Sequence, residues 1–336
     1  MGLGDLGGCC ARYARNERRT LCRNPSPSVA DAPSAPIDAI RGLAVLAEPP
    51  GPEHGSISAA LGFECAPTSP RYSDLFLFQL YPYASVYLGP EGMMGGVARE
   101  RIAGFWHAVG LVAPAEPDHL AALLGLYASL MERARPESLE GDDRGGDRVG
   151  AGPVDAESIL AAEAAGALLS EHLAPWVFAW LERMQDLASG TYAAWASMLY
   201  EVLAAEYRAF GSPSSDLQHL RDAPPLPDPR TEGTAPFLDG LLAPVRSGII
   251  VTRADLAAIA RRLDLGLRAG ERRYALEHLL AQDPEQTLGA LSDAARRQAA
   301  DHELRAPWLG ESARFLAERA RKTGSLCEEL IAAGIA

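Results

Sequence analysis

An acidic residue and a histidine stand side by side at Asp118 and His119, where chemically active side chains are concentrated. A carboxylate can accept two hydrogen bonds from one guanidinium group, and an imidazole changes charge near neutral pH. The pair also has a purely structural interpretation, because Asp118 follows Pro117 and is well placed to cap a helix. Spacing alone favours this second interpretation, with Asp118 as a cap and His119 as a packing residue.

Aromatic side chains are dense in the segment that precedes this pair. Tyr72 and Phe76 lead into a Pro/Gly-rich stretch, residues 81–96, which contains Tyr83 and Tyr87. A loop of this composition is costly to order unless it packs against the protein or binds a partner. The tyrosines are therefore expected either in the core or at a binding surface.

Several kinds of catalytic and cofactor site are missing from the sequence. Lys322 is the only lysine and does not lie in a P-loop, and the chain has no HExxH, GxSxG or CxxC motif. The glycine-rich stretch 89–96 does not follow a predicted strand, so a dinucleotide fold is not supported. We therefore predict no enzyme, no metal site and no cofactor; a weak nucleotide hydrolase is the disfavoured enzymatic alternative.

The cysteines and the apolar runs indicate the compartment. The five cysteines form no pairs with metal or disulfide spacing, which favours a reduced, cytoplasmic protein. Arg18-Arg19 resembles a twin-arginine export signal, but a polar segment rich in Pro and Ser follows it, so we predict no signal peptide. No apolar run reaches the roughly 18 residues that span a bilayer, and no membrane insertion is expected.

The formal charge of −13 is concentrated in the middle of the chain. Residues 60–210 contain nine arginines and twenty acidic residues, a net charge of −11. Phosphate would be repelled there, so nucleic-acid binding is disfavoured, whereas a basic peptide would be attracted. A surface that is simply soluble is the other interpretation of the same charge.

Helical periodicity runs through the whole chain and predicts an all-α fold. We expect a poorly ordered N-terminal tail at 1–55 (with a short helix over 37–47), a helical domain at 56–210 with a linker at 136–155, a linker at 211–235, and a C-terminal helical extension at 236–336. Pro175 is expected to kink or break the long helix 156–188. Thr252 and Asp255 form a capping-box pattern, and helices are predicted at 284–298 and 307–321.

Five short motifs occur in a fixed order between residues 72 and 176. They are Tyr72-Ser-Asp-Leu75-Phe76, Ala84-Ser85-Val86-Tyr87-Leu88, Phe105 to Gly110-Leu111, Pro117-Asp118-His119-Leu120 and His172-Leu173-Ala174-Pro175-Trp176. Each motif is weak alone, but together their order and spacing resemble the TorD/DmsD family of redox-enzyme maturation chaperones. The resemblance covers about residues 57–210, and a weaker one extends over 242–280.

The resemblance implies a TorD-like helical bundle with additional C-terminal helices. It also implies a cytoplasmic chaperone that binds the twin-arginine signal peptide and the apoprotein of a molybdopterin-cofactor oxidoreductase and assists cofactor insertion before export. The residues implied to bind the signal peptide are Tyr72, Leu75, Phe76, Pro82, Tyr83, Ser85, Tyr87, Asp118 and His119. His172, Pro175 and Trp176 are expected to support them.

The chain departs from the family pattern in two places. The usual Gly-Pro after the Leu-Phe motif is missing, which makes the assignment of Pro82 and Tyr83 approximate, and Leu123 stands where the family often has an acid. The expected mode of binding is an apolar groove for the signal peptide, with Asp118 pairing with arginine. The alternative is a generic helical interaction or regulatory protein on the same scaffold. A monomer and a domain-swapped dimer both remain open, as does the client.

Overall fold

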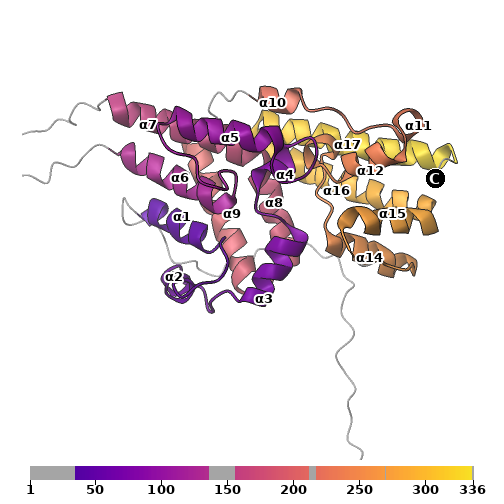
Figure 1. The fold of residues 1–336 in the computed structure, drawn as a ribbon, viewed down its shortest axis with the longest axis horizontal. Coiled ribbons are helices and arrows are strands. Elements are labelled where there is room, and N and C mark those ends of the chain that lie inside the picture. Colours follow the sequence, from indigo (N-terminus) through magenta and orange to yellow (C-terminus); the bar gives the residue numbers. More distant parts are fainter. Residues whose placement is uncertain (1–34, 136–155, 212–216, 269, 335–336) are drawn as a thin grey trace, which may run out of the picture.

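Every regular element in the part of the chain that the structure describes is a helix, so the predicted all-α fold is confirmed (Figure 1). The structure is a computed structural model, and it describes residues 35–135, 156–211, 217–268 and 270–334. The expected tail over 1–34 and the expected linker at 136–155 lie outside these ranges.

The first described helices include the short helix expected over 37–47, and they correct the poorly ordered tail expected over the rest of residues 35–55. Helix α1 (Ala35–Val45) buries Ile40 and Leu43 completely, and α2 (His54–Ala60) follows it. The Trp195 indole Nε1 donates a hydrogen bond to the Leu43 carbonyl oxygen at 2.9 Å. One apolar face of α1 therefore belongs to the main core, because it packs against α6 (Leu120–Arg133) and α9 (Thr191–Ala209).

The remaining helices of the N-terminal half surround this core. They are α3 (Ser69–Tyr72), the π-helix η2 (Ser73–Gln79), α4 (Ala84–Leu88), α5 (Gly96–Ala108), α7 (Ala156–Ala167), the π-helix η3 (Leu168–Leu173) and α8 (Ala174–Leu187). The largest buried side chains of this core include Trp176 and Trp180 of α8 and Trp195 of α9. The short helix α4 lies inside the stretch 81–96 that was expected to be a loop.

Pro175 interrupts the long helical stretch in the predicted region. The α-helical hydrogen-bond pattern of α7 gives way to η3, and Pro175 lies in the first turn of α8. A proline is tolerated there because its missing N–H would have no partner within the helix. The expected break is therefore present, in the form of a π-helix followed by a new α-helix.

The C-terminal half forms a second core around a long helical hairpin. Its helices are α10 (Gln218–Arg221), α11 (Pro229–Glu232), α12 (Thr234–Leu241), α13 (Pro244–Ser247), α14 (Arg253–Leu263), α15 (Arg272–Gln282), α16 (Pro284–Leu309) and α17 (Glu311–Ala332). Helices α16 and α17 lie side by side (Figure 1). The predicted capping box at the start of α14 is confirmed, since Thr252 Oγ1 accepts from Asp255 N and Asp255 Oδ2 accepts from Thr252 N.

Two expected boundaries in this half are wrong. Helix α16 continues from Pro284 through Pro307 to Leu309, and the turn comes at Gly310, whose φ of 73° is costly for other residues. The expected linker 211–235 contains α10 and α11, and Leu217 and Leu220 are buried in the main core.

The two halves also share a buried polar network. Arg305 of α16 pairs with Glu182 of α8, and its Nη2 donates to His302 Nδ1 at 2.5 Å. The opposite ring nitrogen, His302 Nε2, donates to the Gly248 carbonyl oxygen at 3.0 Å. Trp308 packs edge-to-face on Phe178 beside this network.

Candidate functional site

Two segments that are separate in the sequence meet at the N-terminal ends of α4 and α6. Ala84 N donates to the Asp118 carbonyl oxygen at 2.9 Å, and Leu120 N donates to the Pro82 carbonyl oxygen at 2.7 Å. Tyr83 and His119 thereby form an isolated antiparallel bridge. The proline-rich stretch and the Pro-Asp-His-Leu motif are held in a fixed relation by their own backbones.

Asp118 and His119 have different capping partners from those expected. Asp118 is only 2% exposed, and its Oδ2 accepts from Ser85 N at 3.2 Å in the first turn of α4. His119 is the N-cap of α6, because its Nδ1 accepts from Ala121 N at 3.2 Å. The expectation that Asp118 caps the helix following it is therefore wrong: it caps α4, which precedes it by 33 positions.

The apolar residues expected to line a peptide groove lie in the core. Leu75 and Phe76 are essentially inaccessible, and Phe76 contacts the rings of Tyr72, Trp180, Tyr192 and Trp195. The opposite side of η2 carries the exposed apolar residues Leu77 and Phe78, which are 46% and 48% exposed. The expected groove walls are therefore part of the folded scaffold, and the exposed apolar surface of this segment lies at the next two positions.

Ser85 and Tyr87 are also buried, within the scaffold of α4. Ser85 Oγ accepts from Gly95 N at 3.1 Å, and the Tyr87 hydroxyl donates to the Tyr81 carbonyl oxygen at 2.9 Å. The Tyr87 ring stacks on Trp176 with centroids 5.1 Å apart and an interplanar angle of 6°.

The residues expected as support lie directly behind α4. Trp176 Nε1 donates to the His172 carbonyl oxygen at 2.8 Å, which joins η3 to α8. Pro175 and His172 are buried in the same region. These contacts connect Trp176, and through it Tyr87, to the site.

The solvent edge of this region carries two exposed carboxylates, and we call Glu48, Tyr83, Glu116 and His119 together the acidic rim. The Tyr83 hydroxyl donates to Glu116 Oε2 at 3.0 Å, and Glu48 Oε1 lies 3.6 Å from His119 Nδ1. The Tyr83 and His119 rings meet edge-to-face at 4.9 Å. Within the described residues, neither Glu48 nor Glu116 forms an ion pair with an arginine or a lysine.

The two rim carboxylates act electrostatically on the aromatic groups around them. The pKa of His119 is lowered, because burial of the ring outweighs the opposing effects of Glu48, Glu116 and Asp118. Burial raises the pKa of Tyr72 to about 12, with smaller contributions from Glu48 and Glu116. Burial and the hydrogen bond to Glu116 also raise the pKa of Tyr83. A neutral His119 can accept the capping hydrogen bond at Nδ1. It also adds no positive charge that would offset the two rim carboxylates.

The sequence interpretation missed both rim carboxylates. Glu116 lies next to the Pro-Asp-His-Leu motif and could have been included as an exposed acid two residues before Asp118. Glu48 is 70 residues upstream of Asp118 by sequence number, just after α1, and only the packing of α1 on α6 brings it to the site. No local sequence pattern predicts the contact between Glu48 and His119.

Comparison with known proteins identifies the segment that holds most of this site. Residues 68–182 match the model of a family described as nitrate reductase delta subunit. The matched family is a TorD-like family of redox-enzyme maturation chaperones, and residues 68–182 are similar to it. The resemblance inferred from the five motifs is thereby confirmed for this part of the chain. No match was found among curated proteins or among solved structures.

The family assignment carries a coarse functional meaning. This is a family of chaperones rather than of catalysts, and it implies a role in the maturation of a molybdoenzyme partner. Among the described helices, none has the length and apolar character needed to cross a membrane. Glu48 of the acidic rim and the whole C-terminal half lie outside the matched segment.

Proposed function

We propose that this chain is a cytoplasmic chaperone that binds the twin-arginine signal peptide and the apo form of a molybdopterin-cofactor oxidoreductase, assisting cofactor insertion before export. The observation that carries the proposal is the acidic rim within a TorD-like domain. Two exposed carboxylates, which pair with no arginine or lysine among the described residues, flank a tyrosine and a histidine that a backbone bridge joins.

A twin-arginine peptide fits this rim by charge and by geometry. Each guanidinium group can form a two-point hydrogen bond with a carboxylate, so Glu48 and Glu116 provide one acceptor for each arginine. Asp118 has a different role in this proposal, because its carboxylate is committed to Ser85 N and holds α4 in place. The exposed side chains of Leu77 and Phe78 offer an apolar surface for the hydrophobic part of the peptide.

The negative charge of residues 60–210 also favours the binding of a basic peptide. A net charge of −11 over residues 60–210 accelerates the approach of a basic peptide and makes association sensitive to salt. The binding constant is therefore expected to fall as ionic strength rises, mainly through the association rate.

Binding of a synthetic twin-arginine peptide tests the proposal. Titration calorimetry at low salt with the full chain should show saturable binding, and Glu48→Gln combined with Glu116→Gln should weaken it at least tenfold, equivalent to about 1.4 kcal/mol. Glu64→Gln with a second exposed change, Glu53→Gln, is the matched control, because it removes the same charge elsewhere on the surface. A peptide with both arginines replaced by lysine should bind more weakly, since lysine cannot form the two-point bond.

Either of two results would contradict the proposal. If the unmodified chain does not bind the peptide at low salt, or if the rim and control variants weaken binding equally, the acidic rim is not the peptide site.

The family description suggests the first client to examine. It names nitrate reductase, so affinity purification of the full chain from its native cells should recover a nitrate reductase-like molybdoenzyme. Recovery of only non-redox partners would instead support the alternative of a general helical interaction protein.

A further inference from the structure

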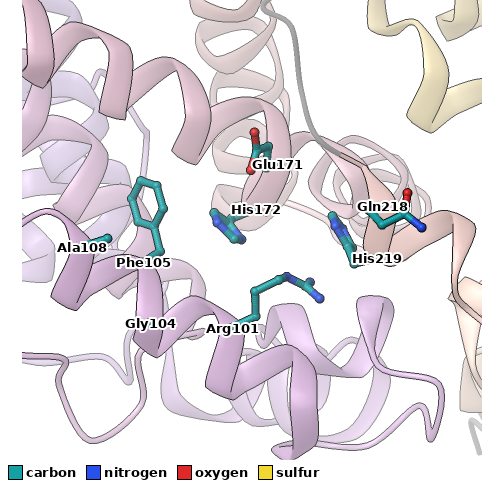
Figure 2. Close-up of a pocket in the computed structure, with 8 residues that line it drawn as sticks. All are labelled: Arg101, Gly104, Phe105, Ala108, Glu171, His172, Gln218 and His219. Carbon is teal, nitrogen blue, oxygen red and sulfur yellow. The ribbon is translucent and has the colours of Figure 1, made fainter.

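A cavity of about 310 Å³ lies between α5, η3 and α10, and none of its lining residues belongs to the acidic rim (Figure 2). Its lining includes Arg101 and Phe105 from α5, Glu171 and His172 from η3, and His219 from α10. The peptide-binding proposal uses none of these side chains for contact, so the cavity raises a separate question.

Arg101 presents two unsatisfied donors here. Its Nε and Nη2 atoms are buried and have no hydrogen-bond partner in the described part of the chain. A buried N–H group without an acceptor costs free energy, and such groups are rare in folded proteins. Burial lowers the pKa of Arg101, and the charge of Glu171 opposes that effect. Nε and Nη2 lie on the same edge of the guanidinium group, the edge that binds two oxygens of one oxyanion.

His172 contributes a third unsatisfied polar group to the same place. The residue is 4% exposed, and no described group bonds its Nδ1 atom. The ring meets Phe105 edge-to-face at 4.9 Å, which fixes its plane. In Figure 2 the Arg101 side chain reaches into the space flanked by His172 and His219.

The chemistry of the lining favours an anion over a cation. In the described residues no group of three or more histidine, cysteine or acidic side chains has the arrangement that would hold a metal ion. Arg101 would also repel a cation, while its free N–H groups need an acceptor. Glu171 offsets part of the positive charge, so selectivity comes from the orientation of the donors rather than from net charge.

We propose that this cavity binds a small molecule through a phosphate or carboxylate group, which accepts hydrogen bonds from Arg101 Nε and Nη2 and from His172 Nδ1. The cavity is larger than a bare oxyanion, and Phe105 and Ala108 give it an apolar wall, so a small organic group accompanies the anion.

Equilibrium dialysis of the full chain against labelled phosphate and, separately, labelled acetate at constant ionic strength tests the proposal. We expect saturable binding of at least one anion, weakened at least tenfold by Arg101→Gln. Arg101→Lys keeps the charge but loses the two-point edge, so it should bind with intermediate affinity. Arg99→Gln is the control on the same helix, because Arg99 already pairs with Glu100 at 2.5 Å, and it should bind as the unmodified chain does.

Each outcome of the dialysis experiment leads to a different conclusion. Binding of phosphate alone identifies a phosphate-bearing ligand, and binding of acetate alone identifies a carboxylate. Arg101→Gln should keep the helical circular dichroism of the unmodified chain, because no described group bonds Arg101 Nε or Nη2. If this variant does not fold, Arg101→Lys replaces it in the comparison. Failure to bind either anion saturably, or equal binding by the Arg101 and Arg99 variants, overturns the proposal without affecting the acidic rim.

Discussion

The Asp118 carboxylate stabilises the first turn of α4 by accepting from Ser85 N, and the ring of His119 does the same for α6. Both helices begin at the junction where the two chain segments exchange backbone hydrogen bonds. At the scale of single residues, the centre of the motif is therefore scaffold. The rim carboxylates Glu48 and Glu116 are the groups left for a partner.

Asp118→Ala should lower the free energy of unfolding by about 1–2 kcal/mol, because Ser85 N loses its acceptor. Asp118→Asn keeps an oxygen at the same position and should cost less. Urea denaturation followed by circular dichroism measures both.

The same variants also test the division of roles. Asp118→Asn should leave affinity for the twin-arginine peptide within about twofold, since each tenfold change needs about 1.4 kcal/mol and no direct contact is removed. A folded Asp118→Asn protein that no longer binds the peptide would show that Asp118 contacts the arginines directly.

At the scale of elements, glycines fix how the C-terminal helices join. Gly248 ends α13 with a φ of 74° and lies directly against the backbone of α17. Gly310 joins α16 to α17 with a φ of 73° and has open space around it. Both positions have a positive φ, but Gly248 is in the left-handed helical region with a ψ of 5°, whereas Gly310 has a ψ of −130°, and they also differ in packing.

These two glycines give a stability prediction. Gly310→Ala should cost about 1–3 kcal/mol, because residues other than glycine rarely adopt a φ of 73° with a ψ of −130°. Gly248→Ala should cost clearly more, because the added Cβ would lie 2.5 Å from the Leu316 carbonyl oxygen and closer still to Ala320 N. Thermal unfolding of both variants checks this; equal losses would mean that α13 does not pack on α17 as described.

At the scale of the whole molecule, the Glu182–Arg305–His302–Gly248 network joins the two halves. Burial, followed by the charge of Arg305, lowers the pKa of His302 to about 3. An unfolded histidine titrates near pH 6.5, so below that pH the unfolded chain binds more protons than the folded one. The contribution of His302 to stability is complete above about pH 6.5 and is lost progressively as pH falls toward 3.

His302→Gln isolates this contribution, because glutamine can still donate to Gly248 and accept from Arg305. Between pH 7.5 and 5, the free energy of unfolding of the unmodified chain should fall about 2 kcal/mol more than that of the variant. Urea titrations of both proteins at the two pH values provide the comparison, and identical pH dependence would exclude a neutral buried His302.

The network also indicates that the C-terminal half is integrated with the N-terminal half. Leu309 and Ala313 belong to the main core, and the Tyr207 hydroxyl donates to the Leu309 carbonyl oxygen. We therefore propose one cooperative unit in place of the separate C-terminal extension expected from the sequence. A single unfolding transition by tryptophan fluorescence and circular dichroism is the expected result, and two resolved transitions would restore the separate extension.

Sequence by itself determined the helical class, the capping box at Thr252 and the family resemblance of residues 68–182, because periodicity, caps and short motifs are local properties. Tertiary structure alone decided which side of η2 faces solvent. In the folded chain Leu75 and Phe76 lie in the core, and Leu77 and Phe78 are exposed. The Asp118 carboxylate caps α4. Tertiary structure also brought Glu48 to His119 and Arg101 to His172, across separations that local patterns do not encode. The Asp118-His119 motif could be found from the sequence. That Glu48 and Glu116 are the exposed carboxylates beside it follows only from the packing of the helices.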